Sequence, residues 1–364
     1  MAKKAYIGVD GVARKVKKMY VGVDGAARKI KKGYIGVGGV ARPFWTGGEL
    51  AYYGKITPPT STYSYSPTAS VGKYGLFFGG DKIVDAYDSS LTHSNPAQLN
   101  ENNSEGTATT VGDYAIVARI SAEAYSSSLV KSIITNLTDG PSPYYRGMFT
   151  AATVGNHALF GGGTLQGRGV TSTVDVYDSS LTHSIATQLS LARSALKAVS
   201  VGNYVLFAGG TTDAASSSVA TVDWYDSSLT KGIATNLSAE KFNMVNISHG
   251  EYGLFLGGTN KNATSVMTVD VYTTSLTKVS VDNISNTANN MNKDSAGVSI
   301  GDFALHKCDN VNVIDVYDRS LVHTTFDVSA SMGSRYGYST VSVGDYALFG
   351  TSPFDKKNMY AFTA

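Results

Sequence analysis

The stretch VGNYVLFAGG, Val201–Gly210, recurs in modified form along most of the chain. Related stretches begin at Val71, Val111, Val154, His249, Ile300 and Val343. Each reads as the opening of a short β-strand, and most are followed by Gly-Gly. Seven copies spaced by about 40 to 50 residues indicate a propeller or a solenoid built from small sheets.

A second motif follows most of these stretches and ends in a Tyr-Asp turn. An example is VDVYDSSLTH, Val174–His183, after which Ile185–Ser190 and Ala195–Val201 supply two further predicted strands. Each unit therefore contains four short strands, which is one propeller blade. The composition agrees with this, because Gly and Tyr are abundant and Pro is scarce.

These repeats resemble the kelch repeat. The shared features are an Arg before the first strand, Gly-Gly closing the second and the Tyr-Asp turn after the third. The resemblance covers residues 50–364 and is strongest around residues 146–189 and 193–237. It departs from the family at Ala118-Arg119, which replaces Gly-Gly, and in lacking the usual outer-strand Trp. It implies an all-β, seven-bladed kelch-like β-propeller over residues 49–364.

The two ends of the repeat region predict how the ring closes. The last unit stops after its third strand, Lys356–Phe362, whereas Glu49–Ile56 is a spare outer-type strand before the first unit. We expect these two segments to pair, because closure removes the free edges that an open array would expose.

A different repeat occupies residues 1–48. Residues 5–18 (AYIGVDGVARKVKK) recur with a period of 14, and residues 1–45 hold eleven Lys and Arg against two Asp, a net charge of +9. Asp10-Gly11, Asp24-Gly25 and Gly38-Gly39 favour type I′ turns, so we predict an arm of three short β-hairpins. In the first hairpin, one face is apolar and the other small or cationic. Glycines in each unit argue against a helix.

Such thin hairpins are marginal alone, so we expect the arm to pair with copies of itself or dock on another protein. A solvated basic tail and nucleic-acid binding are the alternatives; nucleic acid ranks low because each unit has one Tyr. No run approaches the apolar length of a membrane helix, so we expect no membrane insertion.

We find little that points to catalysis or to a metal. His93, His183 and His323 share one repeat position and would be spread around the ring, and Cys308 is the single cysteine. We therefore predict no metal, no cofactor and no enzymatic activity. An oxidase or sialidase site lacks the residues that it needs, and Gly161–Gly169 lies between two strands rather than before a helix.

The loop face is the predicted binding surface, because the second-to-third and fourth-to-first connections of a blade emerge on the same side. Aromatic side chains and Arg gather in these loops and favour binding, although the Tyr could instead pack against neighbouring loops. The candidate ligand-binding residues are Tyr63, Tyr65, Tyr144, Tyr145, Arg146, Arg335, Tyr336 and Tyr338. Arg146, Arg193 and Arg335 share one repeat position, which also fits a structural role.

The arm, Tyr6–Trp45, also resembles N-terminal segments of virion proteins from phages and prophages of Gram-positive bacteria, since GVAR recurs at Gly11–Arg14 and Gly39–Arg42. That resemblance implies a tail, baseplate or fibre protein, assembled in the bacterial cytoplasm. Residues 1–48 would bind other virion proteins, with several copies per particle, and the propeller would bind a host-surface glycan or protein. The alternatives are a decoration protein without a ligand and, ranked last, a carbohydrate-active enzyme. The expected anchoring residues are Tyr6, Arg14, Tyr20, Arg28, Tyr34, Arg42 and Trp45.

Overall fold

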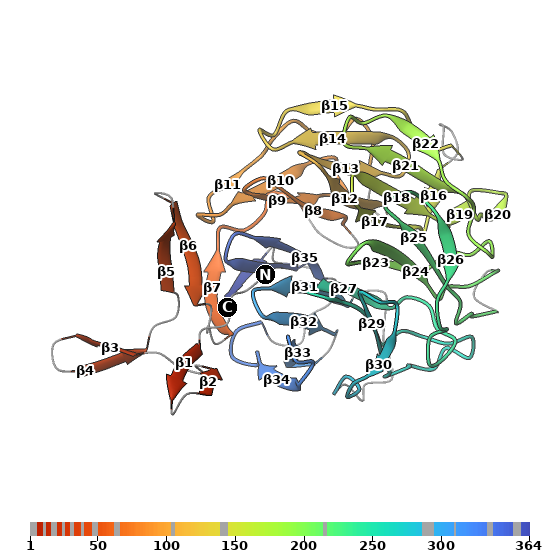
Figure 1. Ribbon diagram of the computed structural model, residues 1–364. Coiled ribbons are helices and arrows are strands. Elements are labelled where there is room, and N and C mark those ends of the chain that lie inside the picture. The colour runs from red at the N-terminus through yellow and green to blue at the C-terminus, as the bar shows by residue number, and fades with distance from the viewer. Residues whose placement is uncertain are drawn as a thin grey trace.

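The computed structural model describes residues 50–61, 66–102, 106–138, 145–213, 217–285, 295–308, 311–332, 338–351 and 358–364, together with the backbone of six strands between residues 6 and 45. The described residues form strands, turns and loops without a helix, so none of them belongs to a helix able to cross a membrane. Four-stranded antiparallel sheets are arranged around a central axis (Figure 1). The architecture is that of a β-propeller.

Seven such sheets are present in the described part of the chain. Their innermost strands are β8 (Thr68–Val71), β12 (Thr107–Val111), β17 (Thr150–Val154), β23 (Lys197–Val201), β27 (Val245–His249), β31 (Ala296–Ile300) and β35 (Tyr338–Val343). The second strands are β9 (Tyr74–Phe78), β13 (Tyr114–Ala118), β18 (His157–Gly161), β24 (Tyr204–Ala208), β28 (Tyr252–Leu256), β32 (Phe303–Lys307) and β36 (Tyr346–Thr351).

The third strand of each sheet carries a buried Tyr, followed by Asp in four sheets and by Ser, Thr or Ala in the other three. These strands are β10 (Val84–Asp88), β14 (Ala122–Ser126), β21 (Val174–Asp178), β25 (Val222–Asp226), β29 (Val269–Thr273), β33 (Val313–Asp318) and β37 (Asn358–Thr363). The outer strands are β11 (His93–Ser94), β15 (Lys131–Ile133), β22 (His183–Ile185), β26 (Lys231–Ile233), β30 (Lys278–Ser280), β34 (His323–Asp327) and β7 (Ala51–Ile56).

The ring closes through β7, which precedes the first sheet in sequence and pairs antiparallel with β37. The partners include Met359 with Ile56 and Thr363 with Ala51, so the pairing expected from the sequence is present. The innermost strands also contact one another in a closed circle, from β8 through β35 and back to β8. Ser70 Oγ donates a hydrogen bond to the Ser342 carbonyl across the junction of the first and last sheets.

The third strand of one sheet holds the segment that leaves the outer strand of the preceding sheet. Tyr177 Oη donates to the Thr135 carbonyl, and the carboxylate of Asp175 accepts from the backbone N–H of Thr138. The equivalent Tyr hydroxyl bonds are Tyr87 to Thr57, Tyr125 to Ala97, Tyr225 to Thr187, Tyr272 to Thr235 and Tyr317 to Asp282. Tyr87 of the first sheet therefore holds the segment after β7 through Thr57, by the same kind of hydrogen bond that joins the other neighbouring sheets.

We call these bonds from the third-strand Tyr and Asp to the connecting segment the latch between neighbouring sheets. They explain why the predicted strand Ile185–Ser190 is wrong. The outer strand is His183–Ile185, and the following residues turn away toward the next sheet. There the Thr187 carbonyl and the Ser190 N–H bond to Tyr225 and Asp223. The backbone groups of this segment are satisfied by the neighbouring sheet rather than by a longer ladder.

The core lies between successive sheets rather than at one centre. Each interface combines apolar residues of the inner and second strands of both sheets with a buried aromatic ring. In one interface Val154, Leu159, Val205 and Phe207 pack beside Tyr225. Phe207 and Tyr225 meet edge to face with ring centroids 5.7 Å apart. Burial of this kind at each interface holds the sheets together.

The arm lies outside the ring (Figure 1). Its strands are β1 (Tyr6–Val9), β2 (Val12–Lys15), β3 (Tyr20–Val23), β4 (Ala26–Lys29), β5 (Gly33–Val37) and β6 (Val40–Trp45), and they pair as three two-stranded sheets. The register places Ile7 opposite Arg14 and Val9 opposite Val12, as the predicted turns require. All seven expected anchoring residues lie on these strands, but their side chains fall outside the described part of the structure.

Candidate functional site

In the predicted loop face, the connection before an innermost strand pairs with the loop between a second and a third strand. β16 (Arg146–Gly147), which precedes an innermost strand, pairs with β19 (Thr164–Leu165), and β19 pairs in turn with β20 (Gly169–Val170) in the loop between a second and a third strand. Thr211 and Thr259 make equivalent bridges in the next two sheets. The two kinds of connection therefore emerge on one side of the ring.

Five of the predicted ligand-binding residues lie outside the described residues. They are Tyr63, Tyr65, Tyr144, Arg335 and Tyr336. The expected meeting of the first and last aromatic clusters therefore stays a prediction.

Arg146 requires a correction, because it is buried and its charge is already paired. Its guanidinium donates to Asp175 and to the carbonyls of Gly162 and Thr173, so it is not presented to solvent. Burial of an unpaired carboxylate costs much free energy, and the guanidinium of Arg146 supplies the counter-charge that offsets this cost. Its shared repeat position with Arg193 is explained in the same way, since Arg193 pairs with Asp223.

The other two described candidates also lie against the protein. Tyr145 is half-buried, and the guanidinium of Arg119 lies 4.5 Å from the centre of its ring. Tyr338 is buried, and its ring packs against Phe349 and beneath the ammonium of Lys307. Tyr338 nevertheless borders the cavity described next.

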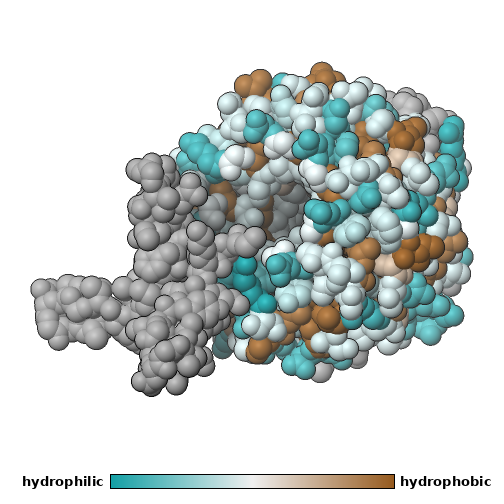
Figure 2. All heavy atoms as spheres, viewed as in Figure 1, coloured by the Kyte–Doolittle hydropathy of each residue, from teal (hydrophilic) through white to brown (hydrophobic). Residues whose placement is uncertain are grey.

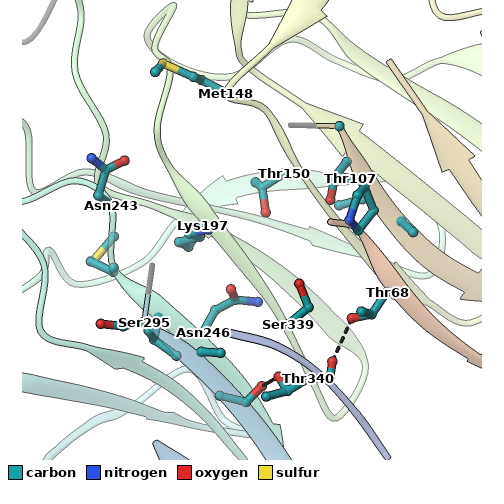
Figure 3. Close-up of a pocket in the computed structure, with 18 of the residues that line it drawn as sticks. Thr68, Thr107, Met148, Thr150, Lys197, Asn243, Asn246, Ser295, Ser339 and Thr340 are labelled. Carbon is teal, nitrogen blue, oxygen red and sulfur yellow. Dashed lines mark hydrogen bonds between the residues drawn. The ribbon is translucent and has the colours of Figure 1, made fainter. Parts of the chain in front are cut away.

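A cavity of about 350 Å³ lies at the axis of the ring, at the end where the innermost strands begin. Figure 2 shows that the molecule is hollowed at the centre of the face turned to the viewer. Strands or connections from each of the seven sheets contribute to the wall. Hydroxyl and amide side chains dominate its labelled lining (Figure 3), namely Thr68, Thr107, Thr150, Asn243, Asn246, Ser295, Ser339 and Thr340.

Lys197 is the single cationic side chain among the described residues of this wall. The described part of the chain gives it neither an ion pair nor a side-chain hydrogen bond, and no acidic side chain is among the described lining residues. Burial lowers the pKa of its ammonium, because the charged form loses solvation without a nearby carboxylate to replace it. The first residue of β23 is thus a poorly compensated cation at the axis.

Farther along the axis a girdle of hydroxyls joins neighbouring sheets. Thr153 Oγ1 donates to the Thr110 carbonyl, and Ser200 Oγ donates to the Thr153 carbonyl. The residues at this repeat position are Ser70, Thr110, Thr153, Ser200, Ser248, Ser299 and Ser342. Ser70, Thr110, Thr153 and Ser342 border a second, more open space of about 390 Å³. The sequence carried this signal, because a Ser or Thr precedes every one of the seven repeated stretches.

The histidines at the shared repeat position are part of the sheet interior. The Nε2 atoms of His93, His183 and His323 lie 2.6, 2.8 and 2.8 Å from Asp85, Asp175 and Asp315. His306 is buried and pairs with Asp315 as well, which accounts for a histidine that the repeat pattern did not explain. No group of three potential metal ligands occurs among the described residues.

Replacement of Lys197 by methionine is expected to raise the midpoint of thermal unfolding. Methionine has a similar length and removes the desolvation cost of an ammonium that no described carboxylate neutralises. Thermal unfolding followed by circular dichroism measures the change. A lower midpoint would mean that the charge has a stabilising partner, which contradicts this description.

The cavity therefore provides one positive charge within a polar wall, which suits a small polar ligand with a negative group. No known family model and no curated protein matches the chain. Among solved structures, the chain is similar to one titled "Structure of YjhT", with a TM-score of 0.54 and 10% sequence identity. The match covers 75% of this chain and 99% of the other. At this identity, the likeness to a propeller-like structure supports the fold alone.

Proposed function

We propose that the chain is a non-enzymatic structural protein of a phage particle, in which residues 1–48 attach a closed, seven-bladed, kelch-like propeller to other virion proteins. The propeller, residues 49–364, is displayed outward and binds a glycan or protein on the host surface. Several copies act together in one particle.

The observation that carries this proposal is the separation of the arm from the ring. The last sheet takes β7 as its fourth strand, and the hairpin strands hydrogen-bond in pairs outside the propeller sheets. The ring is complete without the arm, so the repeated, strongly basic hairpins have no part in closing it. We therefore assign these residues to attachment. The resemblance of Tyr6–Trp45 to phage virion segments supports a phage particle as the assembly to which they attach.

The axial cavity favours a binding role over a decoration protein without a ligand. Its described wall supplies hydroxyls, amides and one ammonium, the groups that recognise polar ligands.

Antibodies raised against residues 50–364 test the proposal on intact particles. We expect them to label the particle surface in electron micrographs and to reduce adsorption to host cells. Failure to bind intact particles would contradict outward display. Labelling without any effect on adsorption would favour the decoration protein instead.

A further inference from the structure

Lys197 is half-buried and differs from three fully buried cations near the start of the sheets. Arg146, Arg193 and Lys241 each form an ion pair with an Asp of the third strand, at 2.8 Å in the last two cases. The charge of Lys197 has no such partner among the described residues. Because a poorly solvated charge without a counter-ion destabilises a protein, its place at the wall of a cavity suits an anionic ligand.

The repeat makes this cation unique on the axis. In the other six units the residue at the position of Lys197 is uncharged, namely Pro67, Thr107, Thr150, Val245, Ala296 or Ser339. Figure 3 shows Lys197 among Thr150, Asn243 and Asn246 at the edge of the cavity. The described wall of the axial cavity therefore carries one positive charge among neutral side chains.

We propose that the axial cavity binds a sugar that bears a carboxylate, with the Lys197 ammonium opposite the carboxylate and the surrounding hydroxyls and amides binding the sugar hydroxyls. This inference rests on the proposed function and names the class of host-surface glycan. The volume of about 350 Å³ lies at the lower end of ordinary ligand sites and suits one or two sugar rings.

The charge of the wall favours a carboxylate over a phosphate ester. A phosphate monoester carries close to two negative charges near neutral pH and is usually held by Arg or by several donors at once. Here the described wall offers one ammonium, which matches a single negative charge. Thr150 and Ser339, at the repeat position of Lys197, and Asn246 line this wall and each already makes one hydrogen bond: Thr150 Oγ1 accepts from the Ala198 N–H, Ser339 Oγ donates to the Ser66 carbonyl, and the Asn246 amide nitrogen donates to the Ala198 carbonyl. The remaining Thr150 hydroxyl proton and the oxygens of Ser339 and Asn246 are the groups that they offer to neutral sugar hydroxyls.

Protonation of Lys197 links binding to pH. Its pKa is lowered by burial, and a bound carboxylate would raise it again by stabilising the charged form. The titratable groups on the two neighbouring strands lie away from Lys197. Tyr204 of β24 pairs with Val201 at the other end of β23, and His249 is the last residue of β27. Near the cavity the other titratable groups are Tyr338 and the Lys307 ammonium above its ring. Affinity for a carboxylate sugar therefore falls as pH rises through the pKa of Lys197, whereas affinity for a neutral sugar stays level.

Saturation-transfer NMR on the full chain tests the proposal with glucuronate, glucose and glucose 6-phosphate as probes. We expect the native protein to prefer glucuronate over glucose by about tenfold, the usual contribution of one charged hydrogen bond. Lys197→Met should bring that ratio to about one. Lys73→Met is the matched control, because Lys73 is an exposed residue in the turn at the opposite end of β8, and it should leave the preference unchanged.

Several outcomes would overturn the inference. They are equal binding of glucuronate and glucose, no binding of glucuronate, a preference for glucose 6-phosphate, and an unchanged preference in Lys197→Met with its thermal unfolding intact. Any of these, combined with antibodies that label particles and block adsorption, would reject the site and leave the proposed function standing. Unlabelled particles would reject the function independently of sugar binding.

Discussion

Replacement of Asp175 by alanine is expected to lower the free energy of unfolding by about 3–5 kcal/mol, the usual effect of breaking a buried ion pair. The Asp175 carboxylate is buried and bonds to Arg146 of β16 and to His183 of its own sheet. It also accepts from the N–H of Thr138, which belongs to the segment arriving from the preceding sheet. The substitution therefore leaves a buried guanidinium without a counter-ion and opens the latch between two sheets.

Urea unfolding of the native and variant chains measures this effect. Asp327→Ala is the matched control, because Asp327 is an exposed carboxylate at the end of an outer strand that accepts only from Ser329, and it should change stability by no more than about 0.5 kcal/mol. Adding Arg146→Met to Asp175→Ala should recover part of the loss, since it removes the unpaired charge. A loss below about 1 kcal/mol for Asp175→Ala would contradict the latch.

The same carboxylate predicts how stability depends on pH. Burial raises the pKa of Asp175, but Arg146 and the hydrogen bonds from Thr138 outweigh it, so the pKa lies below its usual range. Asp270 shows the same balance through Lys241 and Ser238. A group with a lowered folded pKa stabilises the fold above its unfolded value of about 3.9, and that contribution is lost as pH falls through the folded pKa. Asp175→Ala should therefore flatten the loss of stability below about pH 4, seen in urea titrations.

On the proposed function, deletion of residues 1–48 is expected to reduce the amount of this protein in purified phage particles to background. The propeller should unfold at nearly the same temperature, because its last sheet is completed by β7 and the arm strands pair among themselves. Quantitative mass spectrometry of gradient-purified particles gives the first result and circular dichroism gives the second.

A chain with residues 1–45 in scrambled order is the matched control for arm deletion, since it keeps their net charge of +9. If charge alone mediates attachment, the scrambled chain should be incorporated as well as the native one. The hairpin proposal expects it to be excluded, because scrambling destroys the type I′ turns and the alternating faces. Full incorporation of the scrambled chain would support the solvated basic tail.

The repeated sheets could be predicted because each strand carries its own local signal. The stretch after Val201 and the Tyr-Asp motif recur with small changes, so the strand order and the pairing of Glu49–Ile56 with the last repeated strand could be predicted by counting units, and the structure adds the register. The outer strand was harder to predict. Residues after Ile185 have strand-like composition, but their backbone groups bond to the next sheet, and sequence gives no direct sign of a partner some 30 to 40 residues away.

The site was less predictable than the fold. Arg and Tyr in loops suggest binding surfaces, yet Arg146 lies in the interior because Asp175, 29 residues later, supplies its counter-charge. Lys197 carries no sequence signal of a binding role, because a lone lysine at the start of a strand is ordinary. Its significance comes from the alignment of units, in which the other six residues at that position are uncharged, and from its place on the axis. Only the closed ring brings that position beside its six equivalents.

Closure of the ring by β7 is the claim on which the cavity, the latch and the separate arm all depend. Its most direct test is a cysteine pair at Ala51 and Thr363, partly exposed register partners on β7 and β37, in a Cys308→Ala background that removes the buried native thiol. Directly opposed cross-strand residues lie within the distance that a disulfide can span. Mild oxidation should give a monomer with an intramolecular disulfide, seen as faster migration on a non-reducing gel and a higher unfolding temperature. Free thiols that persist after oxidation, or disulfide-linked dimers in place of the closed monomer, would contradict the account.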